Sequence, residues 1–207
     1  LRMVSSYTQL LEKRYKDQLD DSAKTFIHYA VDGATRMQGL INDLLAYSRI
    51  ATKGSEFTSL SSQRAFENAL ANLGGVLEET QAEVTYDELP DVVGDYGQLT
   101  RVFQNLVSNA LKYRKKEVIP RIHVSAGDGG SEWRFSVQDN SIGIDRQYKD
   151  RIFKIFQRLH TAREYSGTGM GLSLCKRIIE RHGGQMWVES EPGVGSTFYF
   201  TVPKQSA

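Results

Sequence analysis

Three short motifs in the second half of the chain constrain the fold most, because they can act together only if they meet in one pocket. They are NLVSN at 105–109, DNSIG at 139–143 and GTGMGL at 167–172. In this order they supply a helix with two amides, a carboxylate on a tight turn and a glycine loop for phosphate. The set is typical of a site that binds a purine nucleoside triphosphate with magnesium.

The bulk composition limits the classes of protein that need to be considered. The 207 residues are 40% hydrophobic and 25% charged, which is typical of a globular protein, and the net charge of +1 gives no basic field for nucleic acid. The single Cys175 fits a reducing compartment, and no apolar run approaches a membrane span. The chain opens without Met, in a helical pattern. We therefore expect a cytoplasmic fragment of a longer protein, with no nucleic-acid and no membrane contact.

Residues 1–50 have the pattern of two helices. The first is expected to end near Lys16, and Asp21 or Ser22 is the expected N-cap of the second. The second helix carries an apolar heptad-like stripe, widened by Val31 and Leu45: Ile27, Ala30, Ala34, Met37, Ile41 and Leu44. Two short helices cannot bury so broad a stripe, so we expect a homodimer that forms a four-helix bundle through residues 1–50. In the alternative, the stripe packs on the rest of the same chain.

A linker at 51–57 is expected to separate this hairpin from a second domain at 58–207. The pattern there predicts a helix at about 61–81, a strand in EVTYDEL, and a helix from about Asp95 to Lys115 with Asp95 as N-cap. A strand hairpin (RIHVSAG, WRFSVQD), a helix after Gly171 and a last strand pair (MWVESEP, STFYFTVP) follow. The fold class is therefore α+β: a helical hairpin, then an α/β sandwich with a mixed, mostly antiparallel sheet rather than a Rossmann fold.

The helix with the first motif places two amides on one face. Asn105 and Asn109 are four residues apart, and a carboxamide oxygen is a suitable ligand for magnesium that already carries phosphates. Lys112 is able to meet phosphate charge, and Tyr113 is able to stack on a base. In isolation, two Asn on a solvated helix edge is an equally simple interpretation.

The second motif follows an apolar strand. Asp139 is placed to accept a hydrogen bond from an exocyclic amine such as that of adenine, and Gly143 allows the backbone to approach the base. The alternative is an ordinary Asx turn.

The third motif combines alternating glycines with the start of a helix. Backbone amides freed at Gly167, Gly169 and Gly171 suit phosphate, although such a loop alone is a weak signal. The polar stretch 157–166 before it has the composition of a mobile lid, from which Arg158 would reach the γ-phosphate.

Together these motifs make the chain resemble the core of a sensor histidine kinase of two-component signalling. NLVSNALKY resembles the N-box of that family, DNSIGI its first glycine box, IFKIFQRLH its F-box and GTGMGL its second glycine box. Residues 1–50 resemble its dimerisation and phosphotransfer hairpin. The residues RLH and the C-terminal sequence are most similar to phytochrome-like kinases. The resemblance implies a Bergerat-type ATP-binding fold, ATP and Mg²⁺ as cofactors, and the receiver domain of a response regulator as partner.

The resemblance also implies roles for particular residues. Asn109 would ligate magnesium, Tyr113 would pack on adenine, and Asp139 would bind its amine. Three residues would act in catalysis: Asn105, Lys112 and Arg158. The remaining nucleotide contacts would come from the glycine motifs: Gly143, Gly167, Thr168, Gly169, Gly171 and Leu172.

Two features depart from the family pattern. Ser141 stands where the first glycine box usually has Gly, which puts in question the strain of the turn and the strength of nucleotide binding. The phosphoacceptor His of the family would fall just upstream of Leu1, so we expect that the chain as given does not phosphorylate itself.

Three functions remain open at this stage. The first is a protein histidine kinase that transfers the γ-phosphate of ATP to a His and then to an Asp of a response regulator. The second is a non-catalytic, dimerising nucleotide-binding module. The third is an ATPase of the same superfamily; it is disfavoured because residues 98–116 contain no Asp or Glu to activate water.

Overall fold

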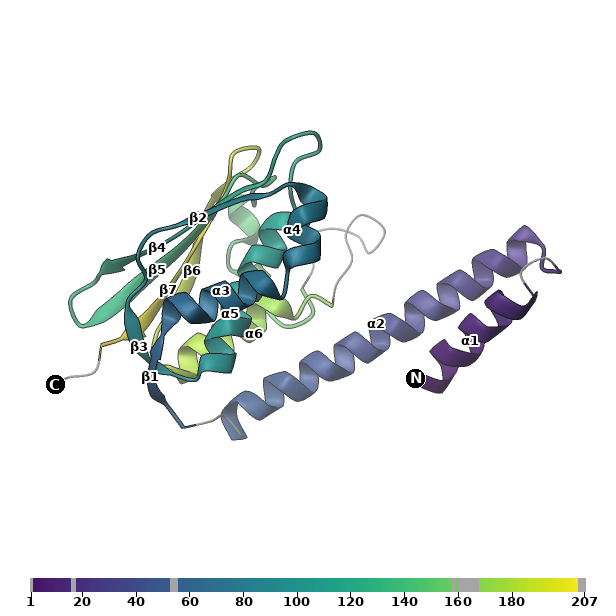
Figure 1. Cartoon of the computed structure of the whole chain (residues 1–207), viewed down its shortest axis with the longest axis horizontal. Coiled ribbons are helices and arrows are strands. Elements are labelled where there is room, and N and C mark those ends of the chain that lie inside the picture. The colour runs from purple at the N-terminus through teal and green to yellow at the C-terminus, as the bar shows by residue number, and fades with distance from the viewer. Residues whose placement is uncertain (1, 16–17, 53–55, 158, 160–167, 205–207) are drawn as a thin grey trace.

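The computed structural model describes residues 2–15, 18–52, 56–157, 159 and 168–204. They form a long helical hairpin and a two-layer α/β domain (Figure 1). The elements in chain order are α1 (Arg2–Tyr15), α2 (Asp21–Thr52), β1 (Thr58–Ser61), α3 (Ser62–Ala71), α4 (Gly74–Thr80), β2 (Glu83–Tyr86), β3 (Asp91–Gly94), α5 (Tyr96–Lys112), β4 (Arg121–Asp128), β5 (Glu132–Asp139), η1 (Arg146–Tyr148), η2 (Arg151–Phe153), α6 (Gly171–Arg181), β6 (Met186–Glu191) and β7 (Gly195–Pro203).

The hairpin consists of α1 packed beside the N-terminal half of α2 (Figure 1). The cap of α2 is Asp20, whose carboxylate accepts a hydrogen bond from the Ala23 N–H at 2.6 Å. The prediction of Asp21 or Ser22 as N-cap was therefore wrong, because both of those residues already lie inside the helix. The cap lies one residue before Asp21. An N-cap must have its backbone outside the helix so that its side chain can turn back onto the first free amides.

The main sheet has five strands in the order β2-β4-β5-β7-β6. Only the β2–β4 pair is parallel; the other three pairs are antiparallel. The expected mixed, mostly antiparallel sheet is confirmed. Strand β5 is central, and its last residue, Asp139, lies opposite Ile122 of β4 and Ser196 of β7. The register therefore brings the expected base-binding carboxylate to a point where three strands meet.

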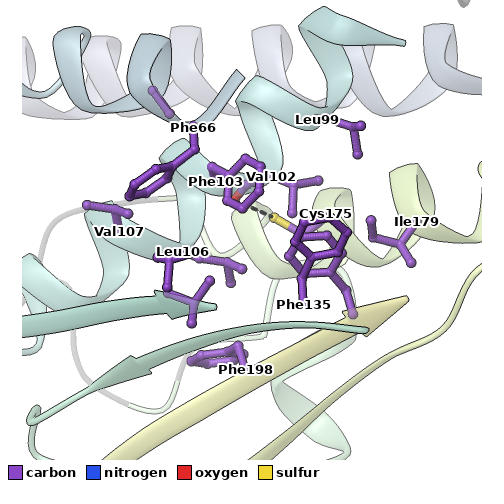
Figure 2. Close-up of a cluster of buried hydrophobic side chains, with 14 of the residues drawn as sticks. Phe66, Leu99, Val102, Phe103, Leu106, Val107, Phe135, Cys175, Ile179 and Phe198 are labelled. Carbon is purple, nitrogen blue, oxygen red and sulfur yellow. Dashed lines mark hydrogen bonds between the residues drawn. The ribbon is translucent and has the colours of Figure 1, made fainter. Parts of the chain in front are cut away.

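The core lies between this sheet and α3, α5 and α6. Phe103 of α5 makes edge-on ring contacts with Phe66, Phe135 and Phe200, so it joins the helical layer to the sheet. Figure 2 shows this cluster, in which the Cys175 thiol points to the Val102 carbonyl oxygen at 3.9 Å. Burial raises the pKa of that thiol to about 12, so Cys175 is an unreactive part of the core.

An apolar stripe along α5 is the face that packs in this core. All seven of its apolar residues are buried: Leu99, Val102, Phe103, Leu106, Val107, Ala110 and Leu111. The helix begins as expected, because the Asp95 carboxylate accepts a hydrogen bond from the Gln98 N–H at 3.1 Å. This leaves the opposite edge of α5, with Asn105 and Asn109, outside the core.

Two local predictions were incomplete. The helix expected at 61–81 is divided into α3 and α4, with Gly74 and Gly75 following the break; paired glycines favour interruption of a helix. A second, two-stranded sheet of β1 and β3 was not predicted, because four-residue strands leave almost no periodicity to detect.

The connection between the hairpin and the α/β domain begins later than expected, because α2 continues to Thr52. Residues 53–55 lie outside the described part of the chain. On the far side, Phe57 stacks on His182 with ring centroids 4.5 Å apart, and Arg181 lies over the same ring. The start of the α/β domain is thus fixed to the C-terminal end of α6.

Candidate nucleotide-binding site

A cavity of about 320 Å³ opens beside the free edge of α5. This volume is within the range of small-molecule sites. Ten of the expected site residues line it together: Asn105, Asn109, Lys112, Tyr113, Asp139, Gly143, Thr168, Gly169, Gly171 and Leu172. The other two, Arg158 and Gly167, lie outside the described residues. The chain therefore does bring the three motifs to one place.

The edge of α5 presents its polar side chains in successive turns. The Asn105 side-chain N–H donates to the Arg101 carbonyl oxygen at 3.0 Å, and its oxygen lies against Gly171 at the start of α6, 3.0 Å from where a Cβ would be. Asn105 thus fixes the spacing of α5 and α6. Asn109 lies one turn further along, at the cavity wall.

The end of α5 is connected to the second motif. The Lys112 ammonium lies 4.7 Å from the centre of the Tyr113 ring, and the Tyr113 carbonyl oxygen accepts a hydrogen bond from the Ile142 N–H at 3.0 Å. The cation and the aromatic ring therefore stand next to the Asp139 turn. In this arrangement a base near Tyr113 and a phosphate near Lys112 would be parts of one ligand.

Two backbone amides hold one oxygen of the Asp139 carboxylate. Its Oδ1 accepts hydrogen bonds from the Ser141 N–H at 2.9 Å and the Ser196 N–H at 3.2 Å. Burial raises the pKa of this carboxyl, while the Ser141 hydroxyl, these two amides and the Lys115 ammonium all act to lower it. A buried carboxylate that lines a cavity and has a perturbed pKa is a typical feature of a binding or catalytic site.

The backbone of the turn after Asp139 shows that Ser141 does not strain it. Ser141 is buried and does not adopt a positive φ, so a side chain at this position introduces no backbone strain. Gly143 does have a positive φ, of 74°, and an added Cβ would lie 2.0 Å from the Glu191 carbonyl oxygen. The glycine that the turn requires is therefore the second one of the motif, which is present.

The glycine loop leads directly into α6. Gly169 has a φ of 77°, and the Thr168 hydroxyl oxygen accepts a hydrogen bond from the Met170 N–H at 3.3 Å. No side chain caps the N-terminus of this 11-residue helix. Amide groups at the start of α6 are therefore directed towards the region where Gly171 and Leu172 line the cavity.

The cavity also contains residues that sequence reasoning missed. Apolar side chains from the turn and from η2 form one wall, among them Ile142, Ile144 and Ile152, and such a wall suits the flat faces of a base. Asp43 comes from α2, and it contacts both Arg101 and Thr168. Its position in the middle of a heptad-like stripe had given no signal, because only the apolar members of that stripe were interpreted.

The cavity provides neutral amide oxygens for a metal rather than a cluster of charged ligands. Within the described ranges, no group of three or more His, Cys, Asp and Glu side chains is arranged to hold a metal ion. Magnesium that is already bound to phosphate oxygens needs few protein ligands, often one or two. The Asn109 amide fits that requirement, so the donor set is compatible with magnesium brought in by a nucleotide.

Comparison with known proteins agrees with this arrangement. The family described as Histidine kinase-, DNA gyrase B-, and HSP90-like ATPase matches residues 94–206. Cyanobacterial phytochrome A of Nostoc sp. is 53% identical over 98% of this chain, which spans 26% of that relative. The catalytic domain of histidine kinase ThkA superposes with a TM-score of 0.63 at 27% identity, covering 72% of this chain and 97% of that one.

A further structure extends the likeness to the hairpin. ShkA, solved at full length with AMPPNP, matches with a TM-score of 0.71 at 24% identity, covering 99% of this chain and 43% of that one. At this level of identity the match shows the fold alone.

The fold and the cavity thus define the class: an α+β ATP-binding domain joined to a helical hairpin. The chain belongs to the Histidine kinase-, DNA gyrase B-, and HSP90-like ATPase family, and within it to the sensor histidine kinase cores. Among the described residues, no helix combines the length and the apolar character needed to cross a membrane.

Proposed function

We propose that this chain binds ATP with Mg²⁺ and donates the γ-phosphoryl group to a histidine side chain. The observation that carries the proposal is the convergence of the α5 amides, the buried Asp139 carboxylate and the glycine loop on one cavity. Each motif alone has a simple structural interpretation. Those separate interpretations do not explain why the three motifs line the same cavity, whereas nucleotide binding does.

The chemistry of the side chains that line the cavity suggests a role for each of them in binding ATP. Asp139, whose Oδ1 is already occupied by two amides, would use its second oxygen to accept the exocyclic amine of adenine. Tyr113 and the apolar wall would hold the base. Asn109 would ligate the metal, which would neutralise phosphate charge, and Lys112 would add a positive charge next to it.

Transfer to a protein nucleophile is favoured over hydrolysis. Helix α5 contains no Asp or Glu, and Asn105 is tied to the helix backbone and to α6, so no general base for water comes from this edge of the cavity. In the transfer, an imidazole nitrogen bonds to the γ-phosphorus as the bond to the β–γ bridging oxygen breaks and ADP leaves. By family resemblance, the phosphoryl group then passes to an Asp of a response regulator, and Arg158 assists the first step.

Nucleotide binding is the first test. Replacing Asn109 by Ala removes one contact to a charged group, so the affinity for ATP in the presence of Mg²⁺ should fall about ten- to a hundredfold. The affinity measured in EDTA should change little. Calorimetric titration with a non-hydrolysable analogue measures both. The matched control is Asn68→Ala, an exposed position of α3 outside the cavity.

Two outcomes would contradict the assignment. If the chain and its Asn109→Ala variant show the same gain in affinity from Mg²⁺, Asn109 is not the metal ligand. If the unaltered chain binds no nucleotide at all, the proposed function is wrong.

The transfer step has its own test. A form of the chain extended at its N-terminus by a phosphoacceptor segment of the family should become labelled by [γ-³²P]ATP, and the label should be acid-labile. Binding without labelling in that extended form would favour the non-catalytic, nucleotide-binding module instead. Release of free phosphate at a comparable rate would favour the ATPase.

A further inference from the structure

One carboxylate at the cavity does not belong to the ATP-binding domain. Asp43 lies on α2, in the half of that helix near the α/β domain (Figure 1), and it lines the cavity together with the three motifs. Its side chain is 27% exposed. The hairpin, which is expected to dimerise, therefore reaches into the wall of the nucleotide site.

Both carboxylate oxygens of Asp43 are used. Oδ1 pairs with the Arg101 guanidinium at 3.2 Å, and Oδ2 accepts a hydrogen bond from the Thr168 hydroxyl at 2.6 Å. Arg101 lies one turn before Asn105 on α5, and Thr168 is in the glycine loop. A bond as short as the second one is typical of a hydrogen bond to a charged acceptor.

The surface of α2 is shaped for this contact. Gly39 lies one turn before Asp43, and an added Cβ there would be only 3.3 Å from the Thr168 methyl carbon. The glycine therefore lets the loop approach α2 closely, although glycine within a helix is less favourable than alanine. Gly39 and Asp43 together form a seat for Thr168.

The contact between Asp43 and Thr168 competes with phosphate binding by the glycine loop. A bound triphosphate would need the glycine loop and its donors, whereas here the Thr168 hydroxyl is given to a carboxylate. Two negative charges at close range repel each other, and the repulsion is several times stronger near a protein surface than in bulk water. Phosphate next to an intact Asp43–Thr168 contact is therefore disfavoured.

We propose that Asp43 is an acidic latch that holds Thr168 of the glycine loop against the hairpin and is displaced by a bound triphosphate. This inference rests on the proposed function. Asp43 is then a positioning residue that acts through Thr168 and Arg101. Because linkage is reciprocal, any event in the hairpin that moves Asp43 away raises the affinity for ATP by the same factor by which ATP weakens the latch.

The test is the affinity of the complete chain for ATP, with and without Mg²⁺, in an Asp43→Asn variant. Asparagine keeps the size of the side chain and removes its charge, so ATP should bind about tenfold more tightly in both conditions. The matched control is Asp32→Asn: Asp32 is on the same helix, paired with Arg36 at 2.9 Å, and does not line the cavity. This control should bind ATP as the unaltered chain does.

A second readout follows the contact itself. Spin labels at Thr35→Cys on α2 and Glu180→Cys on α6, both exposed positions, report the distance between the two elements. When Asp43 is unaltered, ATP should lengthen the distance between the labels or broaden its distribution. The Asp43→Asn substitution should have the same effect without ATP.

The outcomes separate the two proposals. If Asp43→Asn weakens binding only when Mg²⁺ is present, Asp43 is a metal ligand and the latch is wrong. If affinity and distance are unchanged, the contact is incidental and the latch is wrong, while nucleotide binding stands. If no variant binds ATP, both the latch and the proposed function fall.

Discussion

At the scale of single residues, the carboxyl of Asp139 is the group most clearly adapted to binding rather than to stability. Burial raises its pKa above the ordinary value of 3.8. A pKa that is higher in the folded state means that protonation stabilises the fold, and this stabilisation is lost as pH rises through the folded-state pKa. At neutral pH the ionised Asp139 therefore costs stability, which a ligand amine would offset.

Ser141 is predicted to keep Asp139 ionised over a wider pH range. Under the proposed function Asp139 accepts a hydrogen bond from adenine, so affinity for ATP should fall as pH drops through the pKa of this carboxyl. Ser141→Gly removes the hydroxyl but keeps the amide that bonds Oδ1, and the pKa should rise further. The variant should bind ATP nearly as well as the unaltered chain at pH 8 and lose affinity at a higher pH than the unaltered chain does.

A titration series from pH 8 downwards, as far as the chain stays folded, measures this shift. Ser131→Gly, at the exposed β4–β5 turn, is the control for a serine-to-glycine change outside the site. Superimposable pH profiles for Ser141→Gly and the unaltered chain would show that the hydroxyl does not tune Asp139.

At the scale of elements, α2 presents more apolar surface than the chain itself covers. Met37, Ile41, Leu44 and Leu45 are each 45–49% exposed, although the stripe to which they belong is regular. Apolar side chains of α1, including Tyr7 and Leu10, are also exposed. A second hairpin is the cover that a four-helix bundle would provide.

A charge in that stripe should prevent dimerisation. Ile41→Asp should convert a dimer to a monomer, because an unpaired carboxylate would have to be buried between the two hairpins. Light scattering measures the mass, and ATP affinity should remain within about twofold of the unaltered value. An exposed polar position of the same helix, Thr35→Asp, is the control. An unchanged mass for Ile41→Asp would contradict the interface.

Elements with strong local signals were predictable from the sequence. Helix α5 has a cap, a seven-residue apolar stripe and a length of 17 residues, and each of these agrees with the others. Strands β1 and β3 have four residues each, and they form a pair only because the chain between them folds back. The break between α3 and α4 depends on two glycines inside an otherwise helical pattern.

The residues of the site also differ in how far the sequence could predict them. Asn105 and Asn109 were predictable as neighbours, because helical geometry fixes residues four apart. Asp43 was not, since it is separated from Arg101 by 58 positions and from Thr168 by 125. No local rule links residues across such distances; the packing of α2 on α6 brings them together.

At the scale of the whole molecule, the hairpin and the α/β domain are joined by the packing of α2 on α6, and two further contacts reach α5. One is the chain connection, where Phe57 stacks on His182. His182 is buried and accepts a hydrogen bond from the Asp95 N–H at 3.0 Å, so this joint also reaches the start of α5. The other is the contact of Asp43 with Arg101, which lies in the same N-terminal half of α5 as that cap. Movement of the hairpin therefore has two routes to the helix that carries the amides.

The structure of the chain crystallised with a non-hydrolysable ATP analogue and Mg²⁺ tests the central claim most directly. The account predicts the adenine amine within hydrogen-bonding distance of Oδ2 of Asp139, the metal bound to the Asn109 side-chain oxygen, and the phosphates at the glycine loop. A nucleotide bound elsewhere, or with its base away from Asp139, would contradict it.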